Sequence, residues 1–295
     1  MRSNVFGYKL FSSSFCKFIK DDCFTLSLSV SFVFLLAIIP FATLSLLLFD
    51  FIQNLFFPAL NWKIKLTEML AGEVVHIIPF ISKEWVKTHM VTPGAYGSFK
   101  TINFLMLPII SGLIFKSLET SYRKIFELPP RHLVLGQAVY IVMSIFTVLL
   151  FFISNFTWII LSTSVAQILN LMNRAPYLEN LYQVARTYAI SQPINLISAL
   201  VLIVFYLVTV KLFLNIKIRF RYQILAAFIF CILWLIARKF FGFYIQNISE
   251  FNLLYGSLSS VIVILMWIFY SSIVLLFAVE VMYMLHSGSY YYLRW

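Results

Sequence analysis

The sequence predicts an all-α fold, a polytopic transmembrane helix bundle of about six spans with interfacial amphipathic helices. Of its 295 residues, 62% are hydrophobic and only 11% are charged. Long uncharged runs also recur along the chain, and a helix needs about 20 apolar residues to cross a bilayer. A soluble domain carries roughly a quarter charged residues, and it could not hide this much apolar surface. Lipid must therefore be part of the solvent of this chain.

The spans are predicted from apolar segments that charged residues separate. The first segment contains Pro40 and no charged residue, and the second is short and carries Lys116 near its end. A lysine in that position can reach the headgroups through its aliphatic stem. The last segment is long enough to cross with tilt. The predicted spans are 24–49, 101–118, 133–154, 187–210, 222–241 and 255–285.

The uncharged stretch 133–173 is about twice as long as one span needs. It could form two spans, or one span over 133–154 followed by a segment that is interfacial or part of a long or re-entrant helix. The segment Lys211–Arg221 decides the number, because it holds four basic residues and no acid. Short loops of this kind stay in the cytoplasm, and an additional span would place this loop outside. Six spans with both termini in the cytoplasm follow.

Two segments outside the spans have amphipathic patterns. In residues 1–23 apolar side chains repeat at helical spacing and lysines fall elsewhere, which predicts a helix on the cytoplasmic surface. In the extracytoplasmic loop 50–100 an apolar repeat over 66–78 predicts a helix that ends at Pro79. Residues 1–295 are therefore predicted to form a single integral membrane domain. The apolar face of the leader consists of Tyr8, Phe11, Phe15, Phe18 and Ile19, and its lysines are Lys9, Lys17 and Lys20.

Short basic clusters between the apolar runs carry the formal net charge of +11. This arrangement is typical of membrane insertion and of contact with anionic lipid. The predicted partners are membrane lipids, with anionic headgroups at the cytoplasmic face, and nucleic acid is not expected. Membrane-protein partners or a homo-oligomer are left open. The three cysteines, Cys16, Cys23 and Cys231, are too scattered for a disulfide framework or a zinc site.

The sequence contains no pattern typical of a catalytic, cofactor-binding or metal site. Its four histidines, His76, His89, His132 and His286, lie far apart in the sequence, and a metal site needs at least three converging ligands. The acids and bases of a hydrolase or nuclease would also have to cluster. We therefore expect a protein that is not an enzyme and that holds no cofactor or metal.

Glu280 is the most informative polar residue because it lies inside the last predicted span. An ionisable group at membrane depth is costly and normally finds a partner inside the bundle. Glu280 is about 9 Å from the predicted helix end at Leu285, and Lys116, Glu119 and Lys211 are predicted near the same inner surface. We expect an ion pair between Glu280 and Lys116 or a neighbouring base. Its role could be to stabilise the bundle or to move an ion, a proton or a polar headgroup, and simple surface exposure is the third alternative.

The last predicted span begins with Tyr255-Gly256-Ser257, contains Trp267 in its middle and has Phe277-Ala278-Val279-Glu280 near its end. This run resembles the last span of the YihY/BrkB family, which reads Tyr-Gly-small at its start, Trp-x-Tyr-like in its middle and Gly-Ala-Glu near its end. Phe277 stands in place of the family's Gly. Residues 116–126 resemble the stretch after the family's second span, with Arg123 where Asn is usual. The resemblance covers nearly the whole chain.

The resemblance implies a bacterial inner-membrane, multi-pass protein with both termini in the cytoplasm and a part in envelope integrity. Transport of lipid or another amphipathic solute would serve such a role, and a scaffold that binds partner membrane proteins is the alternative. Some family members carry a ribonuclease label. That activity is the least favoured, because the sequence holds no nuclease metal cluster.

Overall fold

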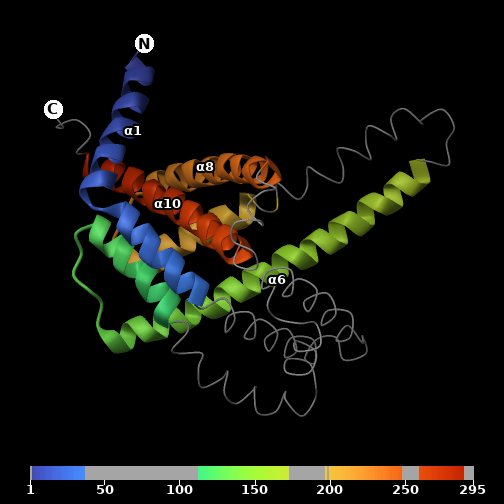
Figure 1. Cartoon of the computed structure of the whole chain (residues 1–295), viewed down its shortest axis with the longest axis horizontal. Helices are drawn as coiled ribbons and strands as arrows, with labels where there is room; N and C mark the ends of the chain where they lie inside the picture. The colour runs from blue at the N-terminus through green and yellow to red at the C-terminus, as the bar shows by residue number, and fades with distance from the viewer. Residues whose placement is uncertain (1, 37–111, 173–196, 198, 248–258, 289–295) are drawn as a thin grey trace.

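A computed structural model describes residues 2–36, 112–172, 197, 199–247 and 259–288. These residues form seven helices and no strand, which confirms the all-α prediction. Figure 1 shows the helices gathered into one bundle, from which α6 extends. The helices are α1 (Arg2–Lys20), a helix at Cys23–Leu36, a helix at 112–125, α6 (Leu133–Met172), a helix at Ala199–Leu214, α8 (Phe220–Asn247) and α10 (Ser259–Ser287).

Each of the six predicted spans has a described part, and each described part is helical. Within the described ranges, three helical segments are long and apolar enough to cross a membrane: Leu133–Leu150, Phe220–Phe243 and Ile262–Ser287. The helices Cys23–Leu36 and Ala199–Leu214 are apolar but shorter in their described parts. The predicted loop 50–100 and the signature residues Tyr255 and Gly256 lie outside the described residues. The number of spans stays a prediction.

α6 settles the conformation of residues 155–172, which the sequence left open. It is one continuous helix of 40 residues, about 60 Å long at 1.5 Å per residue, so 155–172 continues the helix of the third predicted span. The physical reason is that the sequence between Gln137 and Met172 contains no Gly or Pro to break a helix. In Figure 1, α6 extends beyond the other described helices.

The chain bends between α1 and the next helix at Asp21 and Asp22. Asp22 adopts a positive φ of 56°, which takes the chain out of the line of α1 (Figure 1). The Asp22 carbonyl then accepts the hydrogen bond of the Leu26 amide at 3.2 Å, and the Asp22 Oδ1 accepts one from the Thr25 hydroxyl at 2.9 Å. Asp22 is therefore the N-cap of the helix Cys23–Leu36.

α1 packs against α10, and this contact divides the apolar face that the sequence predicts. Of that face, Phe18 is buried there, as is the neighbouring Leu10, whereas Phe11, Phe15 and Ile19 are exposed. Lys17, expected on the polar face, lies in the buried part, and its side chain keeps an exposure of only 11%. The reason is that Lys17 follows Leu10 by seven residues, about two helical turns, and so lies on the same side of the helix.

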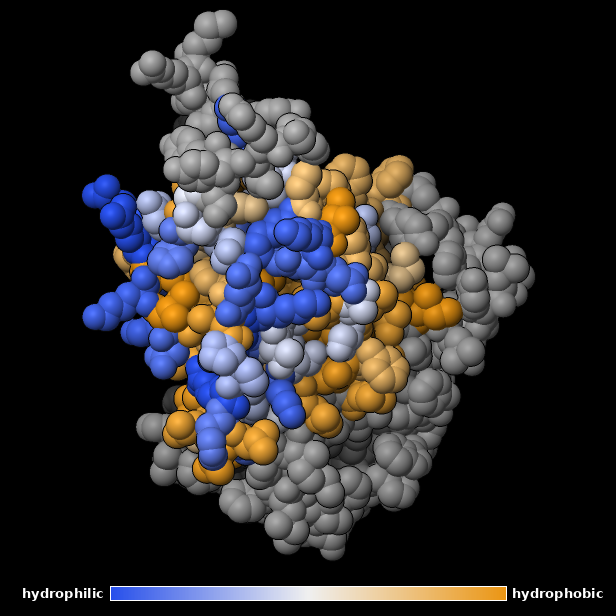
Figure 2. Space-filling model, turned by 90° about the vertical axis from the view of Figure 1, so that its left-hand side faces the viewer, coloured by the Kyte–Doolittle hydropathy of each residue, from blue (hydrophilic) through white to orange (hydrophobic). Residues whose placement is uncertain are grey.

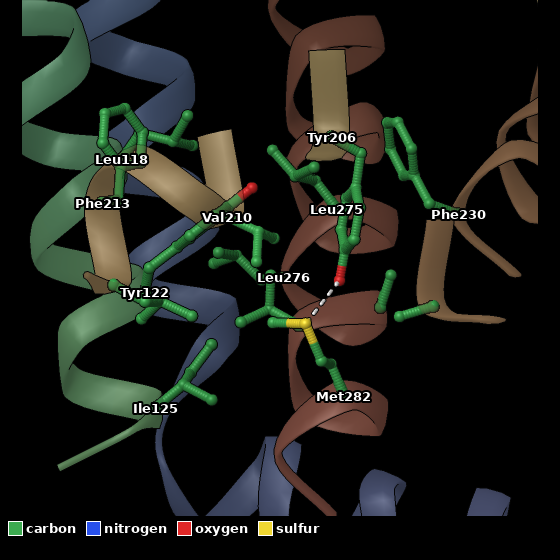
Figure 3. Packing of buried hydrophobic residues seen from close by; sticks show 14 of the residues in the cluster. Leu118, Tyr122, Ile125, Tyr206, Val210, Phe213, Phe230, Leu275, Leu276 and Met282 are labelled. Carbon is green, nitrogen blue, oxygen red and sulfur yellow. Dashed lines mark hydrogen bonds between the residues drawn. The ribbon is translucent and has the colours of Figure 1, made fainter. Parts of the chain in front are cut away.

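The C-terminal half of α10 forms the centre of the core. Leu275, Leu276 and Met282 are buried there against helix 112–125, the helix Ala199–Leu214 and α8 (Figure 3). The Tyr206 hydroxyl donates a hydrogen bond to the Met282 sulfur at 3.9 Å, and the Tyr206 ring stacks on Phe230 with centroids 5.6 Å apart. The nearly uniform apolar sequence of α10 suits a helix that is buried on most sides. The other core residues labelled in Figure 3 are Leu118, Tyr122, Ile125, Val210 and Phe213.

Large apolar side chains form exposed stripes along two helices. The helix Cys23–Leu36 exposes Phe24, Leu28, Phe32 and Leu36, which repeat every four residues. Soluble monomers rarely expose contiguous apolar surface of this kind, so these faces suit contact with acyl chains. α8 exposes a similar stripe of Phe228, Ile232, Ile236, Phe240 and Phe243.

Helix termini of both polarities meet at one end of the bundle. The helices 112–125, Ala199–Leu214 and α10 end there, while Cys23–Leu36, α6 and α8 begin there. Figure 2 shows hydrophilic side chains gathered over this end, with hydrophobic surface beside them. We call it the basic end, and its exposed basic residues are Lys9, Lys20, Lys124, Lys211, Lys217, Arg219 and Arg221.

Candidate functional site

Glu119 is a buried carboxylate on helix 112–125 that faces α6 and the segment before it. The Tyr140 hydroxyl of α6 donates a hydrogen bond to Glu119 Oε2 at 2.5 Å. Arg131 Nε lies 3.0 Å from Glu119 Oε1, and Arg123 Nη1 lies 3.4 Å from the same oxygen. Both carboxylate oxygens thus have donors, and two guanidinium groups compensate the charge. We call these four residues the Glu119 cluster.

The two arginines of the Glu119 cluster also bind the end of a helix. Arg123 Nη1 donates to the Phe213 carbonyl at 3.0 Å, and Arg131 Nη2 donates to the carbonyls of Leu212 at 2.6 Å and Phe213 at 3.2 Å. These carbonyls belong to the last turn of the helix Ala199–Leu214, where intrahelical partners are missing and the dipole is negative. Glu119 therefore holds two bases in the position where they cap that helix.

Glu280 is a fully buried carboxylate on α10. Its Oε2 lies 3.5 Å from Lys17 Nζ of α1, and its Oε1 accepts a hydrogen bond from the Cys23 thiol at 3.4 Å. Within the described residues, Oε2 has no hydrogen bond in addition to this ion pair. The Glu280 cluster, which we define as Glu280, Lys17, Asp21, Cys23 and Tyr283, joins α10 to α1 and to the helix Cys23–Leu36.

Lys17 is the base of the Glu280 cluster, and several groups hold its ammonium. Lys17 forms a second ion pair with Asp21 one turn later. Its Nζ also donates to the Ile125 carbonyl at 3.0 Å and lies 4.1 Å from the centroid of the Tyr283 ring. Burial lowers the pKa of Lys17, but the hydrogen bond with Asp21 and the negative charges of Glu280 and Asp21 raise it more, so the net pKa lies above its ordinary value. Lys17 is protonated at neutral pH.

The end of helix 112–125 and the segment after it connect the two clusters. The Tyr283 hydroxyl donates to Glu127 at 3.4 Å, and the Tyr283 ring contacts Phe126 edge to face at 5.3 Å. The Ile125 carbonyl binds Lys17, whereas Arg123 and Arg131 bind Glu119. Residues 123–131 therefore link the base on α1 to the carboxylate on helix 112–125.

The structure separates the polar residues that the sequence placed together. Glu119 and Glu280 are both buried, but in different clusters, and the base of Glu280 is Lys17. Lys116 and Lys211 are exposed, and in the described part of the chain no ion pair joins either of them to Glu119 or Glu280. Lys116 faces away because the buried side of its helix runs through residues 114, 115, 118, 119 and 122.

Sequence reasoning missed the residues that partner the two carboxylates. Lys17 and Asp21 are four residues apart, which is the spacing of a helical ion pair, and this was the available signal for the base on α1. Arg131 and Tyr140 gave no comparable signal, because their contact with Glu119 depends on how two helices pack. The family-signature residue Trp267 packs against Trp234 of α8, with centroids 5.4 Å apart.

The described residues offer no set of metal ligands. Among the described residues, no group of three His, Cys, Asp or Glu side chains could hold a metal ion. His132 and His286 are exposed, while His76 and His89 lie outside the described residues. The contacts that the structure shows for Glu119 and Glu280 are ion pairs and hydrogen bonds.

Long apolar helices with exposed apolar faces, and carboxylates that are buried only with their bases, define a helical membrane protein. The chain matches the family model of the virulence factor BrkB family over residues 14–292, and it belongs to this family. The family resemblance that the sequence suggested is thereby confirmed.

Two curated proteins are similar to parts of the chain. One is a UPF0761 membrane protein of Chlorobium luteolum, 26% identical over 186 residues, which are 61% of this chain and 39% of that protein. The other is the "Putative ribonuclease-like protein YfkH" of Bacillus subtilis, 28% identical over 91 residues, which are 31% of this chain and 33% of that protein. The chain thus aligns with less than half of the length of either relative. No solved structure matches the chain.

Proposed function

We propose that this protein lies in the bacterial inner membrane with its basic end in the cytoplasm. There it would support the cell envelope by binding anionic phospholipid and moving lipid or another amphipathic solute. Membership of the BrkB family and the exposed apolar stripes support the membrane placement. The proposed orientation follows from the basic loop 211–221, because short cytoplasmic loops carry an excess of Lys and Arg.

The observation that carries the lipid proposal is the charge distribution at the basic end. The buried acids Glu119 and Glu280 are compensated by bases that are themselves largely buried, namely Arg123, Arg131 and Lys17. The exposed bases of the basic end therefore keep most of their charge available to a partner. Each such base near an anionic bilayer surface contributes about 1 kcal/mol of attraction. Phospholipids with anionic headgroups fit this surface.

A flux assay on the full chain tests the proposal. The purified protein is reconstituted into vesicles of phosphatidylethanolamine and phosphatidylglycerol that contain a trace of fluorescent phosphatidylglycerol or phosphatidylethanolamine. Dithionite then bleaches only the label that reaches the outer leaflet. We expect the protein to expose the inner-leaflet label, and to do so faster for phosphatidylglycerol. Bleaching equal to that of protein-free vesicles for both lipids would contradict transport.

A charge variant and a matched control test the role of the basic end. The variant Lys211→Gln/Lys217→Gln removes two exposed charges and should slow the flux of phosphatidylglycerol several-fold more than that of phosphatidylethanolamine. The control Arg238→Gln/Lys239→Gln removes two exposed charges toward the other end of α8 and should keep the wild-type rates. Equal flux of phosphatidylglycerol in all three proteins would contradict a role of the basic end in lipid selection.

A scaffold for membrane proteins is the second candidate, and α6 is the observation that favours it. α6 extends well beyond the other described helices (Figure 1) and would offer a long surface to a partner. We also propose that the protein is not an enzyme. Ribonuclease activity in a highly purified preparation, abolished by His132→Ala, would contradict that statement.

A further inference from the structure

α1 has a buried side and an exposed apolar side that lie next to each other. Leu10, Lys17 and Phe18 are buried against the bundle, and the Phe18 ring contacts Phe277 of α10 edge to face at 6.0 Å. At about 100° per residue, the side chains 11, 15 and 19 point to a neighbouring sector of the helix. The packing with α10 therefore leaves part of the apolar face of α1 uncovered.

The exposed sector consists of Phe11, Phe15 and Ile19, whose exposed fractions are 42%, 52% and 54%. The Phe11 ring, at one edge of this sector, also lies 6.0 Å from the Phe277 ring of α10. The three residues follow one another at a spacing of four residues and so form a continuous stripe along one side of α1. The exposed lysines of the helix, Lys9 and Lys20, lie on the far side from this stripe. An apolar stripe opposite a basic face is the pattern of a helix that lies in a membrane interface.

A second exposed apolar stripe begins beside α1. The Phe18 ring contacts Phe24 edge to face with centroids 5.1 Å apart, so the start of the stripe Phe24, Leu28, Phe32 and Leu36 lies beside α1. This second stripe belongs to an apolar helix of a membrane protein, and acyl chains are the partner of such a face. The position of this stripe next to α1 indicates the same partner for α1.

The bend at Asp22 gives α1 a direction that suits this partner. α1 does not continue the line of the helix Cys23–Leu36; in Figure 1 it crosses the end of α10 and projects sideways beyond the other described helices. A helix that turns away from a spanning helix at the bilayer surface runs along that surface. Its apolar side then reaches the boundary between headgroups and acyl chains, about 5–10 Å deep.

We propose that α1 is an interfacial anchor in the leaflet on the side of the basic end. Phe11, Phe15 and Ile19 insert into the acyl boundary, Lys9 and Lys20 contact anionic headgroups, and the pair of Lys17 and Glu280 attaches the anchor to α10. The partner of this surface is the lipid bilayer. The inference depends on the membrane placement of the protein and not on any transport activity, so the two can fail separately.

Spin-label accessibility in proteoliposomes tests the anchor. Cys16→Ser removes the partly exposed thiol, and Cys23 and Cys231 are buried. A nitroxide is then attached at Phe15→Cys, or at Lys9→Cys as the matched control on the opposite side of the same helix. The probes are oxygen, which concentrates in the acyl region, and a polar nickel chelate, which stays in water. The unsubstituted Cys16→Ser protein gives the background of the buried thiols.

We expect the label at residue 15 to collide several-fold more with oxygen than with the nickel chelate, and the label at residue 9 to show the reverse ratio. The same result at Ile19→Cys covers the case in which Phe15→Cys does not fold. Equal ratios at 15 and 9, or a higher ratio for nickel at 15, would overturn the proposal. Dipolar broadening at 15 that disappears on dilution with unlabelled protein would also overturn it, because a second copy would then cover the stripe.

Discussion

Lys17 carries the positive charge that compensates two carboxylates, those of Asp21 and Glu280. Removal of one partner from a buried ion pair leaves an uncompensated charge, which typically costs about 3–5 kcal/mol. The two partners are not equivalent here. Lys17 without Glu280 still has Asp21, whereas Glu280 without Lys17 has lost its base and keeps the hydrogen bond from the Cys23 thiol.

We therefore expect Lys17→Met to lower the free energy of unfolding by about 3 kcal/mol or more, and Glu280→Gln to lower it by clearly less. Denaturation of the purified protein in detergent, followed by circular dichroism, measures both. The double variant should be more stable than Lys17→Met alone, because glutamine carries no charge to leave uncompensated. Lys20→Met is the control, an exposed lysine on the same helix whose loss should change stability by less than about 0.5 kcal/mol. Strictly additive losses would contradict the pairing.

The charge of Lys17 also predicts a dependence of stability on pH. Its pKa in the folded protein lies above the ordinary value of 10.5, so the folded state binds the proton more tightly than the unfolded state. The stabilisation by this charge is complete below pH 10.5 and is lost as the pH rises through the folded pKa of Lys17. The stability difference between wild type and Lys17→Met should therefore shrink as the pH rises above 10.5. A difference that grows above pH 10.5 would contradict the assignment.

At the scale of the element, the sequence predicts the helices well, but it predicts poorly which residues of different helices contact one another. Long uncharged segments made the membrane helices recognisable, and the absence of Gly and Pro from 137–172 explains why α6 continues. The base of Glu280 could not be predicted in the same way, because Lys17 and Glu280 are separated by almost the whole chain. Lys116 belongs to a helix of the bundle, but it lies on the exposed face of that helix and so points away from the buried carboxylates.

The C-terminal end of the helix Ala199–Leu214 depends on groups from another part of the chain. Arg131→Gln removes the guanidinium that donates to the Leu212 carbonyl and pairs with Glu119. We expect a loss of about 1.5–3 kcal/mol, the usual range for a hydrogen bond to a charged group. Hydrogen exchange should become faster in the last turn of this helix. The exposed Arg219→Gln at the same end is the control, and unchanged exchange in Arg131→Gln would contradict the capping role.

At the scale of the whole molecule, the basic end combines a closed interior with an open surface. Glu119 and Glu280 are buried with bases of their own, and the exposed bases of this end point outward. This is how a chain that exposes apolar stripes can also present a charged surface to headgroups. Composition indicates the excess of positive charge, but only the fold decides which bases are occupied by Glu119 and Glu280 and which are available.

The length of α6 has a consequence for how the protein fits its bilayer. A rod of about 60 Å would have to lean by about 60° to stay within a hydrocarbon layer about 30 Å thick, and membrane helices seldom lean by more than about 40°. The distal portion of α6 must therefore emerge on the side away from the basic end. Residues 155–172 include no charged side chain. This part of α6 would therefore be poorly hydrated if water surrounded it. The apolar surface of residues 155–172 therefore has to be covered, by other parts of the same polypeptide, by a neighbouring protein or by a locally thickened bilayer.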